Sequence, residues 1–223
     1  MPNPAELLFN QFTEWNQPDK SVHSARMDGK PLSFHRRAVQ NLNDVRHLLN
    51  EMQNAGKRVN SHLDMFPTWA QVIFQPEVPW GAHRTGGIDK HCLQILETLI
   101  DPMDEFVNKM EPESFDKLLD YLVEIETALD EDEALSKEIK HSTKTLLNHL
   151  RNSIKEFNQV GEWRTDKLIK QLFGELAFVM IQSQKKEVWF DVLNNFVFPY
   201  VVNQVPGIEA TGFLTAINPG SGN

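Results

Sequence analysis

The chain contains a single cysteine, Cys92, among its 223 residues, so no disulfide can form within it. A lone cysteine fits a reducing compartment. The longest strictly apolar run covers residues 177–181, far short of the roughly 20 residues that cross a bilayer. The first residues lack a basic stretch followed by an apolar one, which a secretory signal would show. We therefore expect a cytoplasmic protein that does not enter the membrane.

The common motifs of nucleotide and serine-hydrolase chemistry are also missing. The sequence has no phosphate-cradling Gly-x-x-x-x-Gly-Lys, no Gly-x-Gly-x-x-Gly and no Gly-x-Ser-x-Gly. The closest grouping of metal-ligand types is His83, Asp89 and His91, whose spacing matches no recurrent zinc signature. Cys92 lies on an apolar stripe, which disfavours a nucleophilic thiol. We expect no cofactor and no metal, and the balance favours a protein without enzymatic activity.

Helical periodicity is the main structural signal, because apolar residues recur three and four positions apart. In the first segment Asn3 is placed to cap a helix that Pro4 begins. Residues 16–32 are expected to form a polar loop, followed by a helix that starts after Ser33 and ends at Gly56. One or two short helices broken by Pro67 come next, and then a loop through residue 87.

Further amphipathic segments follow from residue 88 onward, and we expect Asp130 and Glu133 to form a capping box for a long helix. No sustained strand alternation occurs before residue 197. The predicted fold is all-α: an antiparallel bundle of roughly six to eight helices with an irregular apolar C-terminal segment. The expected division of this single domain is residues 1–32 (short helix and loop), 33–184 (core), and 185–223 (a helix and extended tail on the bundle or a partner).

Negative charge is concentrated in one stretch. Residues 101–140 contain fourteen acids and four lysines, whereas the remaining residues come to about neutral, so this stretch accounts for the chain's net charge of −9. Asp116, Asp120 and Glu124 fall off the apolar stripe, and Asp130, Glu131 and Asp132 are expected at a helix start, where the helix dipole favours carboxylates. Such a surface disfavours nucleic acid and anionic membranes and suits a basic protein partner.

An alternative hypothesis for the function rests on Arg84 and His91. Arginine, six residues and histidine resemble the Arg-x4–6-His motif of the HEPN-type helical ribonucleases. The resemblance covers eight residues, and Gly86 and Gly87 inside it depart from a helical setting. It implies that His91 acts as acid or base and that Arg84 stabilises phosphate charge.

The sequence thus favours a non-enzymatic protein that works by protein–protein interaction. The predicted contact residues are those six acids together with Trp80, which lies in a loop between Pro79 and Gly81. The apolar C-terminal segment is the second expected contact surface, and it could instead hold a homo-oligomer together.

Overall fold

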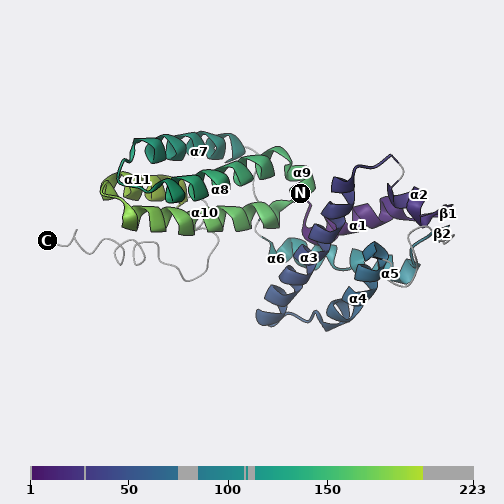
Figure 1. Cartoon of the computed structure of the whole chain (residues 1–223). Helices are drawn as coiled ribbons and strands as arrows, with labels where there is room; N and C mark the ends of the chain where they lie inside the picture. The colour runs from purple at the N-terminus through teal and green to yellow at the C-terminus, as the bar shows by residue number, and fades with distance from the viewer. Residues whose placement is uncertain (1, 28, 75–84, 108, 110–113, 198–223) are drawn as a thin grey trace. The chain divides into compact units, whose positions relative to one another are not determined.

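The computed structural model describes residues 2–27, 29–74, 85–107, 109 and 114–197, apart from the side chains of residues 114 and 195–197 (Figure 1). These residues form helices and one two-stranded sheet, which confirms the all-α class. They divide into two compact units, which are Met1–Asn108 with Gly161–Trp163 and Lys109–Val160 with Arg164–Asn223. The buried apolar side chains accordingly form two clusters, whereas the sequence predicted one core for residues 33–184.

The first unit is built around helices α1 and α3. Its elements are α1 (Pro4–Trp15), β1 (Gln17–Ser21), α2 (Val22–Met27), α3 (Leu32–Asn54), α4 (Asn60–Phe74), β2 (Thr85–Gly86), α5 (Lys90–Glu97) and α6 (Ile100–Phe106). Helix α1 packs against α3, α5 and α6, and α4 packs against α3 and α5. The cluster between them includes the fully buried side chains of Phe12, Trp15 and Trp69.

The helix ends of this unit follow their local signals closely. The Asn3 side chain accepts hydrogen bonds from the backbone N–H groups of Ala5 and Glu6, as predicted for the cap of α1. Gly56 has a φ of +79°, the left-handed conformation that glycine tolerates after a helix. Helix α3 begins at Leu32 rather than after Ser33, and Pro31 precedes it without a side-chain cap.

The expected loop at residues 16–32 is wrong, because it contains strand β1 and helix α2. Strand β1 pairs antiparallel with β2, with Gln17 opposite Gly86. A Cβ at Gly86 would lie 2.6 Å from the Ala25 Cβ and 2.8 Å from the Gln17 oxygen, so glycine is needed for this approach. This pairing joins two short polar segments that are distant in sequence. Neither segment has the alternation of apolar and polar residues by which a strand is predicted, so the sequence did not indicate the pairing.

The predicted break at Pro67 is also wrong. Helix α4 continues through Pro67, although proline removes one helical hydrogen bond. Trp69 and Ile73, beyond the proline, are fully buried, and the Trp69 indole Nε1 donates to the Cys92 carbonyl oxygen at 3.2 Å. Burial of these side chains holds α4 in place despite the proline.

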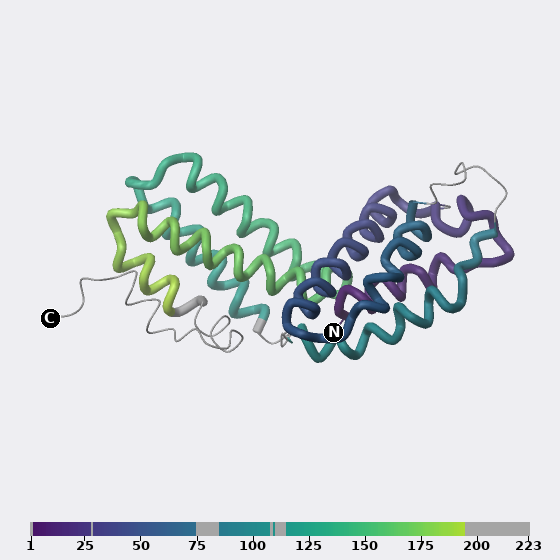
Figure 2. The backbone as a smooth tube through the Cα atoms, turned by 90° about the horizontal axis from the view of Figure 1, so that it is seen from below, coloured from purple at the N-terminus to yellow at the C-terminus, as the bar shows by residue number. Residues whose placement is uncertain are grey.

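The second unit consists of helices packed around one apolar cluster. Its elements are α7 (Ser114–Glu131), α8 (Lys137–Lys155), α9 (Phe157–Val160), α10 (Glu162–Gln182) and α11 (Lys186–Val197). Both views show α7, α8, α10 and α11 lying alongside one another (Figures 1 and 2). Lys144 pairs with Asp130 and Arg151 with Glu126, so α7 and α8 run in opposite directions.

The predicted capping box at Asp130–Glu133 is wrong. Asp130 and Glu131 are the last residues of α7, where the helix dipole disfavours carboxylates, and Ser136 instead caps α8 by accepting from the Ile139 N–H at 3.3 Å. Lysines compensate at the α7 end, since Lys144 pairs with Asp130 at 2.6 Å and Lys185 Nζ donates to the Glu131 carbonyl at 2.8 Å.

Asp132, in the turn after α7, is a buried carboxylate at 1% exposure. It accepts hydrogen bonds from the Ser183 hydroxyl, the Trp189 indole Nε1 at 2.9 Å and the Ala134 N–H at 3.1 Å. Burial alone raises the pKa of the Asp132 carboxyl, but these hydrogen bonds and the charge of Lys185 outweigh it and hold the pKa below its usual range. The carboxylate therefore joins the α7–α8 turn to the α10–α11 turn.

Replacing Asp132 with Asn should destabilise the protein by about 2 kcal/mol, because the neutral amide leaves buried donors poorly satisfied. The lowered pKa means that the Asp132 contribution is present above about pH 4 and is lost as pH falls below that value. The difference between wild type and Asp132→Asn should therefore shrink in acid. Urea unfolding followed by circular dichroism between pH 7 and pH 3 measures it.

The matched control is Asp130→Asn, which removes an exposed ion pair and should cost less than about 1 kcal/mol. Equal losses for the two variants would show that the Asp132 network contributes no more than a surface pair.

Gly161, between α9 and α10, combines a positive φ of +81° with close contacts. A Cβ there would lie 2.6 Å from the Pro2 carbonyl oxygen. Gly174, inside α10, has open space around the same position.

Gly161→Ala should lower the free energy of unfolding by more than about 1 kcal/mol, because of both the backbone conformation and the contact with Pro2. Gly174→Ala should instead raise it by about 0.5–1 kcal/mol, since alanine is the better helix former. Thermal unfolding of the two variants compares them, and a stabilised Gly161→Ala would refute the proposed constraint.

Candidate functional site

A hollow of about 260 Å³ lies between α7 and α11 in the second unit. We call it the α7–α11 groove. It is lined by Tyr121, Glu124, Ile125, Val188, Asp191 and Val192. Ile125 belongs to the buried cluster, whereas Val188 is 46% exposed. The groove therefore connects an apolar base with a solvent-exposed apolar side chain.

On each of the two helices, the lining residues follow the spacing of one helix face. Positions 121, 124 and 125 of α7 and positions 188, 191 and 192 of α11 are separated by three and four residues, so each triplet lies on one side of its helix. Trp189 and Leu193 on α11 are buried in the core, which fixes how α11 presents the neighbouring positions. Each helix contributes apolar side chains and one carboxylate.

The two groove carboxylates have no ion pair or hydrogen-bonded partner within the described part of the chain. They are Glu124 on α7 and Asp191 on α11, and both are exposed. Asp120 and Asp116 precede Glu124 by one and two helical turns and are exposed as well. Negative charge therefore continues from the groove along the same face of α7.

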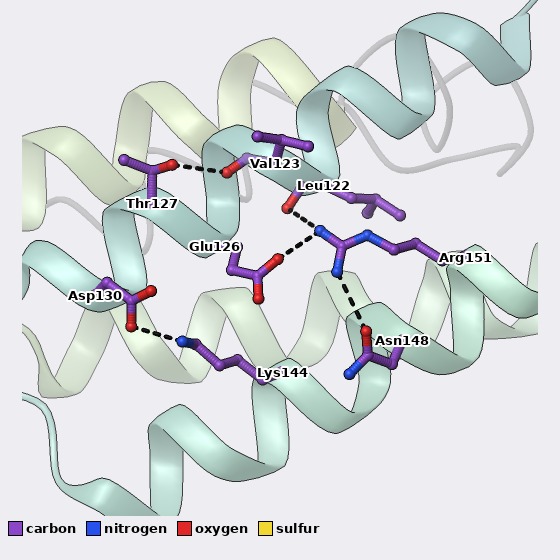
Figure 3. Close-up of polar contacts among 8 residues, drawn as sticks. All are labelled: Leu122, Val123, Glu126, Thr127, Asp130, Lys144, Asn148 and Arg151. Carbon is purple, nitrogen blue, oxygen red and sulfur yellow. Dashed lines mark hydrogen bonds and ion pairs between the residues drawn. The ribbon is translucent and has the colours of Figure 1, made fainter.

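The opposite edge of α7 is neutralised by α8 (Figure 3). Arg151 Nη2 donates to Glu126 Oε2 at 2.6 Å and to the Leu122 carbonyl at 3.2 Å, and its Nη1 donates to Asn148 at 3.2 Å. Lys144 binds Asp130 one turn further along α7. The acids of α7 thus include an edge that is paired with α8, formed by Glu126 and Asp130, and an exposed face that includes Glu124 at the groove.

Five of the six predicted acidic contact residues are exposed, and one is buried. Asp116, Asp120 and Glu124 lie on the exposed face of α7, and Asp130 and Glu131 are exposed at its C-terminal end. Asp132 must be removed from the set, because its carboxylate is buried and saturated by Ser183, Trp189 and Ala134. Trp80 lies outside the described residues, as does the tail at 198–223.

Of the two residues predicted for a ribonuclease, Arg84 and His91, the structure describes one. His91 is exposed on the first turn of α5, and Arg84 lies outside the described part of the chain. Asp89, between them in sequence, caps α5 by accepting from the Cys92 N–H at 3.0 Å. Burial, with a smaller contribution from Asp89, raises the pKa of the Cys92 thiol to about 11, so it stays protonated at neutral pH.

Within the described residues, no group of three or more His, Cys, Asp or Glu side chains could hold a metal ion. Glu138 and His141 have the Glu-x-x-His spacing of helical metal sites, but both are exposed on α8. None of the described helices is both long and apolar enough to span a membrane.

Sequence reasoning missed the α11 half of the groove. The spacing of Val188, Asp191 and Val192 was visible in the sequence, but the sequence of one helix does not reveal which neighbouring helix faces it.

Comparisons of the chain with protein-family profiles, with curated proteins and with solved structures find no match.

Proposed function

We propose that the protein works by protein–protein interaction and that the α7–α11 groove binds a basic, amphipathic segment of its partner. One observation carries this proposal: a hollow that is lined by apolar side chains from two helices also has an exposed carboxylate on each of them, and neither carboxylate has a partner among the described residues. An apolar side chain of the partner would fill the hollow, and flanking Lys or Arg side chains would meet Glu124 and Asp191.

The size of the hollow sets the scale of the interaction. A volume of about 260 Å³ accommodates one or two apolar side chains rather than a broad interface. We therefore expect a short linear segment to bind with micromolar affinity, roughly −8 kcal/mol. Exposed charges contribute mainly to association rate and specificity, so binding should weaken as salt rises.

The remaining acids of α7 extend the same interaction. Asp116 and Asp120 continue the negative face beyond Glu124, so a partner segment running along α7 would meet further favourable charge. The apolar segment within residues 185–223 stays a predicted second contact surface, either for a partner or for another copy of the chain. The ribonuclease alternative through Arg84 and His91 also stays a prediction, and loss of any RNA cleavage in His91→Ala is its test.

Reversing both groove charges, Glu124→Lys with Asp191→Lys, should weaken binding of a basic amphipathic peptide at least about tenfold, because attraction at two sites becomes repulsion. The probe is a labelled helical peptide of about 16 residues with leucines on one face and lysines beside them, measured by fluorescence anisotropy. Added salt should weaken the wild-type complex.

The control is Glu133→Lys, which reverses an exposed charge in the turn between α7 and α8. Its affinity should stay within about twofold of wild type. An equal loss in this control would mean that the peptide responds to total charge and not to the groove.

Val188→Asp should abolish the apolar contact and weaken peptide binding by about tenfold or more, while stability changes little at this exposed site. Val123→Asp is the matched control, because Val123 is 58% exposed on α7 and does not line the groove. If both variants bind as wild type does, the apolar part of the groove is not the contact surface.

A further inference from the structure

Arg26 is a buried cation in the first unit, whereas the α7–α11 groove belongs to the second unit. Its side chain is 2% exposed on the short helix α2. Burial lowers the pKa of the guanidinium to about 10, so the group remains charged at neutral pH. A buried charge is costly unless an opposite charge compensates it.

No carboxylate among the described residues pairs with Arg26. Its Nη1 donates to the Val72 carbonyl oxygen, which is a neutral acceptor. Glu14, the acid next to Trp15 in sequence, instead pairs with Lys30. Among the described residues, the positive charge of Arg26 is therefore met by a main-chain dipole and an aromatic ring.

Two buried N–H donors in this cluster lack an acceptor within the described residues. They are the Nε of Arg26 and the indole Nε1 of Trp15. The two side chains are in direct contact, since the Arg26 guanidinium carbon lies 5.4 Å from the centre of the Trp15 ring. Buried donors without acceptors are rare in native proteins, and two neighbouring ones indicate that an acceptor belongs there.

The charge that is needed is a single negative one. His35 stacks on Trp15 with ring centres 5.3 Å apart. Burial and the nearby charge of Arg26 lower the pKa of His35, so its ring is neutral at pH 7 and adds no second positive charge. A carboxylate carries one negative charge, whereas phosphate carries between one and two and would leave uncompensated charge in a buried site.

We infer that Arg26 and Trp15 form a binding site for the carboxylate group of a small-molecule ligand. The carboxylate oxygens would accept from the Arg26 Nε–H and the Trp15 indole N–H, while Nη1 keeps its bond to Val72. This site lies in the first unit and does not depend on the proposed protein-binding groove.

Acetate is the probe for this site, added to the full chain with sodium chloride at equal ionic strength as the reference. NMR of the Trp15 indole N–H, assigned with Trp15→Phe, should show a saturable shift with acetate and none with chloride. Thermal unfolding should show matching stabilisation. At tenfold excess over the dissociation constant, the ratio of folded to unfolded protein should rise about 11-fold. Samples are equilibrated with acetate before heating because both donors are buried.

Arg26→Lys keeps the charge but removes the Nε–H donor, and Trp15→Phe removes the indole donor while keeping an aromatic ring. Both variants should lose most of the acetate stabilisation. Two variants are used because either change alters a buried side chain. Unchanged acetate stabilisation in both, or an equal response of wild type to chloride, would overturn the inference. A stronger response to inorganic phosphate than to acetate would overturn the assignment to a carboxylate.

The chain itself offers two competing carboxylates that are close in sequence to this site and lie outside the described residues. They are Asp28, two residues after Arg26, and Glu77, five residues after Val72. Asp28→Asn and Glu77→Gln separate these sources from a ligand. Acetate stabilisation of wild type that persists unchanged in both variants supports a separate ligand. Acetate stabilisation that emerges only in one of these variants shows that the replaced side chain fills the site, and the inference then fails.

Discussion

The arrangement of the second unit depends on one buried carboxylate. Asp132 accepts hydrogen bonds from Ser183, Trp189 and Ala134, and so holds the turn after α7 against the start of α11. A charge with so little exposure is tolerated only where its hydrogen bonds are well formed, so alternative placements of α11 are penalised. The α7–α11 groove follows from this constraint, because its two walls are the helices that Asp132 connects.

The first unit contains the opposite situation. Arg26 is as deeply buried as Asp132, but one neutral carbonyl and the face of Trp15 are its contacts among the described residues. Asp132 has its hydrogen bonds satisfied, whereas the Nε–H of Arg26 has no acceptor among the described residues, so the two buried charges have different roles. Asp132 organises structure, whereas Arg26 retains the capacity to bind an anion. Neither role is visible in the net charge of the chain, which the exposed acids dominate.

Local signals in the sequence predicted local features well. The cap at Asn3, the turn at Gly56 and the apolar stripes of the helices follow from backbone hydrogen bonding and helical spacing, which depend on neighbouring residues. The failures were long-range. Burial of Trp69 and Ile73 carries α4 through Pro67, and pairing with Gly86 turns a polar loop into strand β1. The sequence predicted Asp130 at the start of a helix, but Asp130 lies at the end of α7. Ser136 provides the cap of α8.

The sequence by itself determined the all-α class, the positions of most helices and the concentration of acid in residues 101–140. These properties arise from periodicity and composition, which are local. Only the tertiary structure decided which acids are exposed, which are paired and which is buried. Asp120 and Glu124 are exposed to solvent, Asp130 forms an ion pair with Lys144, and Asp132 is buried. That difference depends on which helix packs beside each carboxylate, and packing partners are a property of the folded chain.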